Sequence, residues 1–368
     1  MSSPVMTSPS ANAGLIPLRG WRIHPQSPAG LMDCSLIVAT YQRPAEIEDL
    51  IVHLSTTPDV PAEVLIVDSS PGNDTEDAVL RASASPLPFE LIYVRSPKGL
   101  TRQRNVGIDI SKNPFVYFLD DDAKPLEGYF ERLRNVFLND PKETIGAVGA
   151  CIVNEINKPI NRRWQLRRAI GLIPRTEPYI YNHVGTSAPT GLLKPFSGIR
   201  DVDIFAGGAC AIRRRVFQDD RFSEFFEGYS YGEDLEMSLR IRQNWRIVCC
   251  GDAHMWHFGI VRTGGRPSAF IKGRMEIKNR YLIWQRYSRH TTVLNKIRFH
   301  LDLLFLFLMD LAWLVVQPRG SHLSHACGLL TSAVSCAIAP PKWTEPEAVP
   351  CYCLDRIGGN PEYASAAR

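Results

Sequence analysis

The residues with the clearest chemical potential are the consecutive aspartates Asp120, Asp121 and Asp122, which directly follow the apolar run 115–119. That run is rich in aromatic and branched residues, which predicts a buried strand ending at Asp120. Unpaired carboxylates are too costly to bury in a core. They either face solvent in a turn or bind a hard divalent cation such as Mg²⁺ or Mn²⁺, which prefers oxygen ligands. We expect a metal site here, because ligands of open α/β sheets bind at the carboxyl ends of strands.

A second pair of carboxylates, Glu233 and Asp234, lies between an aromatic-glycine segment and an amphipathic helical pattern. Capping and the helix dipole favour carboxylates at a helix start, which explains one of the two without any function. The other is placed to act as a general base beside a substrate hydroxyl. Further along, His257 is of interest only together with these carboxylates, because a lone histidine is more often structural.

The first part of the chain alternates strands and helices. Apolar runs predict strands at residues 34–40, 63–67, 89–94 and 115–119, with helices at 45–54 and within 99–110. This alternation in units of ~30 residues indicates a doubly wound nucleotide-binding sheet. The predicted strands that end at Thr40, Asp68 and Asp120 should bring polar side chains to one crevice.

Composition bounds the class of protein. The chain has 368 residues, 45% of them hydrophobic and 22% charged, as in a globular protein with a substantial core. A net charge of +4 is too small to imply a nucleic-acid partner. The 9 cysteines lack regular zinc-site spacing, and the chain shows no N-terminal segment of signal-peptide type. Reduced thiols in the cytoplasm are therefore expected.

Residues 301–316 form a strongly apolar helical run that contains Asp302 and Asp310. A bilayer span needs ~20 mostly apolar residues, and aspartates inside it would be costly. We therefore do not predict a membrane span. Basic residues precede the run, as in a helix that rests on an anionic membrane surface. Packing on the rest of the protein, or a homodimer interface, is the alternative.

A basic cluster comprising Arg162, Arg163, Arg167 and Arg168 lies in the segment 157–200, which is otherwise irregular in pattern. Long irregular segments inside a compact domain are usually functional or mobile. The cluster is interpreted as a solvated face, with an anionic acceptor or a lipid phosphate as the alternative ligand.

Taken together, these motifs resemble those of the inverting family 2 glycosyltransferases of the GT-A fold, over residues 34–286. The similar segments follow in the family's order. They are SLIVATYQRP (35–44), VLIVDSS (64–70), GLTRQRNVG (99–107), LDDD (119–122), FAGGACAIRR (205–214) and GEDLEMSLR (232–240). The fourth looks like the family's DxD signature. Each segment is weak alone, and their order and spacing make the resemblance specific, with bacterial rhamnosyl- and galactosyltransferases among the similar proteins.

The resemblance implies an α/β fold of GT-A type: a doubly wound nucleotide-binding sheet with an acceptor-side extension and a C-terminal helical segment. The expected divisions are a flexible tail at 1–30, a nucleotide-sugar-binding half at 31–125, an acceptor-binding and catalytic half at 126–290, an apolar helical segment at 291–340 and a loose tail at 341–368.

The implied activity is transfer of a hexose from a nucleotide-diphosphate sugar to a hydroxyl of a glycan or lipid-linked acceptor, with inversion. Mn²⁺ or Mg²⁺ would neutralise charge on the leaving diphosphate. Such an enzyme would work in polysaccharide or cell-envelope synthesis, in the cytoplasm or peripherally at the inner face of the cell membrane. The second motif ends in DSS, where many relatives have two acidic residues and a glycine. No polymerase-type QxxRW motif occurs, which favours single addition over processive synthesis.

Two other functions compete with this one. A non-catalytic nucleotide-sugar or glycan-binding protein would share the fold, but would not need the acid at Asp234. A nucleotidyltransferase would be expected to carry a Gly-rich, Lys-containing phosphate loop near the first strand, and the segment TYQRP (40–44) is not one.

The resemblance also implies roles residue by residue. The catalytic base would be Asp234. The metal ligands would be Asp120, Asp122 and His257. Residues in contact with the nucleotide-sugar donor would be Thr40, Arg43, Asp68, Gly99, Arg102, Arg104, Asn105, Asp120 and Asp121, although a solvated turn explains Asp121 equally well. Acceptor-side residues would be Gly207, Gly208, Glu233 and Trp256.

Overall fold

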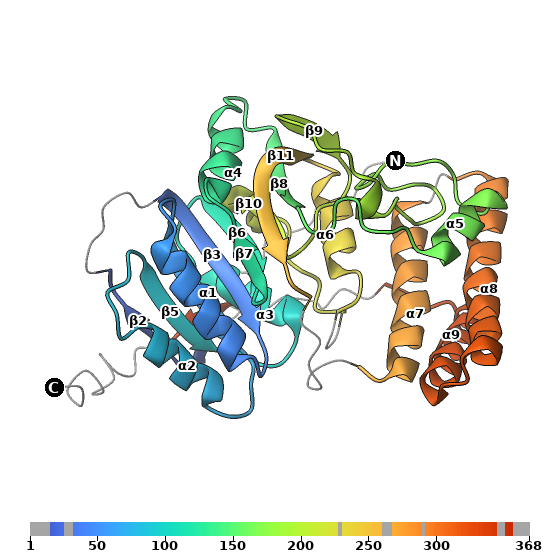
Figure 1. Ribbon diagram of the computed structural model, residues 1–368, viewed down its shortest axis with the longest axis horizontal. Coiled ribbons are helices and arrows are strands. Elements are labelled where there is room, and N and C mark those ends of the chain that lie inside the picture. Colours follow the sequence, from blue (N-terminus) through green and yellow to red (C-terminus); the bar gives the residue numbers. More distant parts are fainter. Residues whose placement is uncertain are drawn as a thin grey trace.

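The computed structural model describes residues 15–25, 32–226, 230–259, 267–288, 291–343 and 350–355. A central sheet has helices on both of its faces, and a separate group of helices stands at one end of the molecule (Figure 1). This arrangement confirms the predicted α/β class.

The N-terminal half supplies parallel strands joined by helices. Its strands are β3 (Met32–Thr40), β4 (Pro61–Asp68), β5 (Glu90–Arg95) and β6 (Phe115–Asp120), paired in the order β5-β4-β3-β6. The connecting helices are α1 (Pro44–Thr56), α2 (Asp74–Ala82) and α3 (Leu100–Ile110). The predicted alternation is confirmed with small shifts at the element ends, and Pro44 occupies the first helical position, where its missing N–H costs nothing.

The second half adds strands in both directions. They are β7 (Ala123–Pro125), β8 (Ile145–Ile152), β9 (Ile199–Val202), β10 (Ala209–Arg213) and β11 (Arg246–His257). β10 is antiparallel to both β6 and β8, whereas β11 runs parallel to β8 and antiparallel to β7 and β9. With β2 (Gly20–Ile23) at the other edge, the strand order is β2-β5-β4-β3-β6-β10-β8-β11-β7.

Two hydrophobic cores lie on opposite faces of this sheet. Helices α1, α2 and α4 (Tyr129–Leu138) contribute to one core, and α3 and α6 (Glu233–Ile241) to the other. Because alternate side chains of a strand point to opposite faces, β3 sends Leu36 and Val38 into the first core and Ile37 into the second.

The expected chain tails are partly ordered. We predicted a flexible segment at 1–30 and a loose one at 341–368, but β1 (Ile16–Leu18) pairs in parallel with β12 (Tyr352–Leu354). In β2, Trp21 stacks on Tyr93 with ring centroids 5.4 Å apart. These strands are too short to show a periodic pattern, and their partners are distant in sequence. Residues 1–14 and 26–30 of the first tail, and 344–349 and 356–368 of the second, lie outside the described residues.

The C-terminal helices are α7 (Ala269–Tyr287), α8 (Val293–Val316) and α9 (Gly320–Ile338). α7 and α9 approach closely: a Cβ at Gly328 would lie 2.1 Å from the carbonyl oxygen of Phe270. By length and composition alone, α8 could cross a membrane, since an 18-residue stretch of it has a mean hydropathy of 2.0.

The aspartates of α8 are neutralised by other parts of the protein. Asp302 is fully buried and accepts hydrogen bonds from Arg167 at 2.5 and 2.6 Å and from Arg280 at 2.6 Å. Burial opposes ionisation, yet these guanidinium groups hold the pKa of Asp302 below its ordinary value. Asp310 pairs with Arg163 at 2.7 Å and with His325.

Two arginines of the basic cluster therefore have a structural role. Arg163 and Arg167 belong to the short helix α5 (Arg162–Ala169), and their side chains are committed to α8. For these two residues, the predicted solvated face or lipid-phosphate ligand was wrong, because both are paired with aspartates of α8. The local sequence did not indicate these partners, which lie far along the chain. Arg168 lies over the Trp164 ring at 5.6 Å.

Replacing Asp302 by alanine is expected to lower the free energy of unfolding by about 3–5 kcal/mol, because it leaves buried guanidinium groups unpaired. Denaturant midpoints measure the loss. The control is Asp201→Ala, which removes the exposed pair with Arg246 (49% and 71% exposed) and should cost about 0–1 kcal/mol. Equal midpoints for the two variants would show that the buried pairs do not hold α8 in place.

Candidate active site

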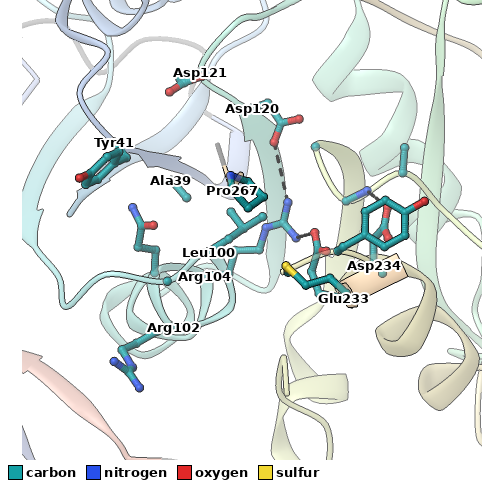
Figure 2. A pocket seen from close by; sticks show the side chains of 18 of the residues that line it. Ala39, Tyr41, Leu100, Arg102, Arg104, Asp120, Asp121, Glu233, Asp234 and Pro267 are labelled. Atoms are coloured by element: carbon teal, nitrogen blue, oxygen red, sulfur yellow. Dashed lines mark hydrogen bonds and ion pairs between the residues drawn. The ribbon is translucent and has the colours of Figure 1, made fainter. Parts of the chain in front are cut away.

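A pocket of about 1820 Å³ is lined by the ends of β3 and β6, the start of α3 and the start of α6. Small-molecule pockets are commonly ~300–1,000 Å³, so this one has room for two ligands. Both acidic groups singled out in the sequence line it, and Figure 2 shows them on facing walls.

One wall holds a group with the character of a metal site. Single ligand atoms of Asp120, Asp122 and His257 all lie within 4.8 Å of one another. The Nε2 atom of His257 is 3.3 Å from Asp122 and 3.6 Å from Asp120. Two carboxylates and an imidazole fit a divalent transition ion such as Mn²⁺.

The fold brings His257 to the aspartates through an edge strand. β7 directly follows Asp122 and pairs with the end of β11, so that Ala123 lies opposite His257. Asn154 fixes this end, donating to the His257 carbonyl at 2.7 Å and accepting from its N–H at 3.1 Å. The carboxylates of Asp122 and Glu155 raise the pKa of His257 to about 10. A metal ion that binds here has to displace the imidazole proton.

Asp121 has a different environment from its neighbours. It is only 7% exposed, accepts from Thr40 Oγ1 at 2.8 Å and pairs with Arg43 at 2.6 Å. Burial raises its pKa to about 7, against the opposing effect of Arg43. Thr40, Arg43 and Asp121 all line the pocket, and their mutual bonds join the end of β3 to the end of β6. The alternative of a solvated turn at Asp121 was wrong.

Arg104 connects the two acidic groups. Its side chain is 4% exposed, donates to Glu233 at 3.1 Å and lies 3.8 Å from Asp120 (Figure 2). Although burial opposes it, these carboxylates raise the pKa of Arg104. The guanidinium group therefore remains charged and reduces repulsion across the site.

Gly207 and Gly208 make this close packing possible. A Cβ at Gly208 would lie 2.3 Å from the Asp120 carboxyl carbon, and one at Gly207 would lie 2.9 Å from an Arg104 nitrogen. Both glycines line the pocket. The two glycines thus leave space for the side chains of Asp120 and Arg104. The acceptor contact expected from the sequence would be an additional role.

The opposite wall presents Glu233 and Asp234 at the start of α6. Gly232 precedes them with φ +91°, a left-handed conformation that favours glycine. Asp234 accepts hydrogen bonds from the backbone N–H of Leu235 at 2.7 Å and of Gly207 at 3.4 Å. Burial raises the pKa of both acids, that of Glu233 to about 8.

Some residues singled out in the sequence lie elsewhere. The described pocket lining does not include Asp68, Asn105 or Trp256. Asp68 is fully buried, and its carboxylate accepts from Ser70 and Tyr93. Asn105 bonds to the backbone of Phe222 through both ends of its amide. Trp256 neighbours His257 on β11, so the two side chains point to opposite faces.

Gly99 and Arg102 line the pocket as expected. Gly99 precedes α3 with φ +139°, and Arg102 pairs with Glu224 at 3.1 Å. Gln103 lies in the same motif, but its role was not predicted from the sequence. Its amide donates to the carbonyls of Thr40 and Val67, which ties together the ends of β3 and β4.

Other pocket residues are marked only weakly in the sequence, or not at all. Glu155, beyond the end of β8, lies 4.0 Å from His257, and Lys98 lies 4.1 Å above the Tyr41 ring. The α7 residues Arg274 and Lys278 also line the pocket. Nothing local in the sequence marks these last two, because only the packing of α7 brings them there.

The chain was compared with known proteins. A family model described as glycosyl transferase family 2 matches residues 35–221, just over half of the chain. An uncharacterized glycosyltransferase of Haemophilus influenzae is 30% identical over 107 residues, which cover 29% of this chain and 35% of that protein. A probable N-acetylgalactosaminyltransferase 6 of Caenorhabditis elegans is 26% identical over 203 residues, 53% of this chain and 31% of that protein. The matches thus span about a third of each curated relative.

Solved structures share the fold. The mannosyltransferase PcManGT of Pyrobaculum calidifontis, in complex with GDP-Man and Mn²⁺, has a TM-score of 0.51 at 16% identity, covering 85% of this chain and 89% of that one. GalNAc-T7 with UDP, GalNAc and Mn²⁺ has a TM-score of 0.51 at 15% identity, covering 83% and 55%. With the family match and the pocket described above, these likenesses lead to one conclusion: the chain belongs to glycosyl transferase family 2 and has a GT-A fold.

Proposed function

We propose that this protein moves a sugar from a nucleotide-diphosphate sugar to a hydroxyl of a glycan or lipid-linked acceptor, with inversion and with a divalent metal ion. The observation that carries the proposal is that one pocket joins the Asp120, Asp122 and His257 group to a second acid, Asp234, on the facing wall. A protein that only bound nucleotide sugars would need the first group but not the second.

The donor side of the pocket is the proposed nucleotide-sugar site. It is formed where β3 ends and α3 begins, the usual ligand position in open α/β sheets. Lys98 and Arg102 supply positive charge there, and Tyr41 offers an aromatic face. The structural neighbours with GDP-Man or UDP support this class of donor.

Asp120, Asp122 and His257 would hold the metal ion. When bound, it neutralises the negative charge that grows on the leaving diphosphate. The imidazole in the set favours Mn²⁺ over Mg²⁺, because magnesium prefers oxygen ligands. The neighbours that contain Mn²⁺ support the same ion.

Asp234 is the proposed general base. The acceptor oxygen forms a bond to the anomeric carbon, the bond from that carbon to the diphosphate oxygen breaks, and the acceptor proton passes to Asp234. Attack from the face opposite the leaving group inverts the anomeric configuration. The raised pKa of Asp234 strengthens it as a proton acceptor. Glu233 instead pairs with Arg104 and is assigned a positioning role.

The variant Asp234→Asn should lower the transfer rate by about 10²–10⁴-fold, the usual contribution of a general base. Donor and Mn²⁺ affinity should remain near the wild-type values, because Asn keeps the shape of the side chain. Transfer is followed by release of nucleoside diphosphate, and NMR of the product gives the anomeric configuration. The control is Asp201→Asn on the exposed strand β9.

Wild-type activity in Asp234→Asn would contradict the role of this residue, and a product with retained configuration would contradict inversion. A wild-type protein that binds Mn²⁺ and nucleotide diphosphates, but neither transfers nor hydrolyses any sugar donor in a screen, would favour the non-catalytic binding protein.

Metal dependence has its own test. Removal of divalent ions with EDTA should stop transfer, and Mn²⁺ should restore it. The variant Gly208→Ala should weaken Mn²⁺ binding about 10- to 100-fold, as is usual when the support of a ligand is lost. The reason is that the new Cβ would lie 2.3 Å from the Asp120 carboxyl group.

Calorimetric titration with Mn²⁺ measures this loss. The matched control is Gly72→Ala, because a Cβ there has no neighbour within 4 Å among the described residues. Equal Mn²⁺ affinity in both variants and the wild type would exclude Asp120 as a metal ligand.

A further inference from the structure

Helix α8 carries an apolar face that no described part of the chain covers. Its exposed side chains recur at helical spacing along the whole helix, and include Val293, Ile297, Leu301, Leu304, Leu308 and Val315. Each of these is at least 47% exposed. Large contiguous apolar surfaces of this kind mark interaction sites in soluble proteins.

Helix α9, which packs against α8, also exposes apolar side chains at helical spacing. Leu323, Leu330, Val334 and Ile338 are spaced seven, four and four residues apart and are all at least 46% exposed. In Figure 1 the two helices stand together at the end of the molecule farthest from α1 and α2. We call the exposed apolar side chains of both helices the α8–α9 face.

The inward side of α8 is fixed by the rest of the protein. Asp302 and Asp310 point to Arg167, Arg280 and Arg163, on the side opposite Leu301 and Leu308. A bilayer span would have to break these ion pairs and place both aspartates in hydrocarbon, which is costly. The helix is therefore built to lie along a surface, with one side on protein and the other exposed.

Within residues 291–343, the exposed charges are of one sign. Within residues 291–343, all described, the acidic residues are Asp302 and Asp310, and both are buried. Lys296 lies near the start of α8, Arg319 in the turn before α9, and Lys342 beyond α9, and all three are exposed. Trp313 stacks on His322 near that turn, with ring centroids 6.5 Å apart.

We propose that the α8–α9 face binds the surface of an anionic lipid bilayer, with α8 in the interfacial plane. Apolar side chains would enter the boundary between headgroups and acyl chains, while the surrounding cations meet lipid phosphates.

A second copy of the chain fits this surface less well. A two-fold dimer places the same patch on both sides of the interface. It would bring the cations of one face against those of the other, with no exposed carboxylate within residues 291–343 to pair with them. Charge complementarity therefore favours anionic lipid.

Binding in this way would also orient the pocket. α7 contributes Ile271, Arg274 and Lys278 to the pocket lining. The same helix packs closely on α9 (Figure 1), where a Cβ at Gly273 would lie 2.4 Å from the His325 carbonyl oxygen. The α7 side of the pocket would thus be the side nearer the bilayer. This favours a lipid-anchored acceptor over a soluble glycan, a conclusion that rests on the proposed function, whereas the membrane contact does not.

The test is flotation of the full chain with lipid vesicles, without any sugar donor. Vesicles of equal parts phosphatidylcholine and phosphatidylglycerol should carry the protein, and pure phosphatidylcholine should bind at least tenfold more weakly. Replacing Lys296 and Arg319 by glutamine should weaken anionic binding about fivefold for each cation.

The triple variant Leu301→Gln, Leu304→Gln, Leu308→Gln should abolish flotation and still unfold in one cooperative melting transition, because these side chains are about half exposed. The matched control is Val52→Gln with Leu138→Gln, which changes residues of similar exposure (both 51%) on α1 and α4 and should bind like the wild type. Asp234→Asn should also float like the wild type, which separates this test from that of the proposed function.

The proposal is overturned if the wild type fails to float with anionic vesicles, or if the triple variant floats as well as the wild type. It is also overturned if the wild type is a stable dimer that does not float and the triple variant is a monomer, because the face would then belong to a second copy.

Discussion

The geometry of the pocket depends on the ion pairs of Arg104. The triple-aspartate turn and the Glu233-Asp234 turn are far apart in sequence, and their like charges repel when brought together. The nearly buried guanidinium group lies between Asp120 and Glu233 and offsets that repulsion. Gly207 and Gly208 permit the approach, since side chains there would overlap Arg104 and Asp120. Arg104 and the two glycines thus allow the two acidic groups to line the same pocket.

Much of this could be predicted from the sequence, because the strands carry continuous apolar runs and end in polar residues. The meeting of Asp120, Asp122, Asp234 and His257 followed from that pattern together with the family resemblance. Predictions were wrong or incomplete where an unseen partner decided the outcome. Asp68 is occupied by Tyr93 and Ser70, and the contribution of α7 to the pocket arises from helix packing alone.

Two features that were ambiguous in sequence explain one another in the structure. Aspartates inside an apolar helix and arginines inside an irregular segment each lacked a clear role. Paired as Asp302 with Arg167 and Asp310 with Arg163, they attach α8 to the rest of the protein. Breaking such pairs is costly because it leaves a buried charge alone. Local patterns do not reveal this relation, since the partners are separated by more than a hundred residues.

The pairing of β7 with β11 also governs when the pocket is complete. During synthesis the aspartates emerge well before His257, and β7 has no partner until the end of β11 has left the ribosome. Since domains form as their chain emerges, nascent chains that end before this strand lack His257 beside Asp120 and Asp122. A chain that terminates before β11 therefore leaves β7 without its partner strand and one wall of the pocket incomplete.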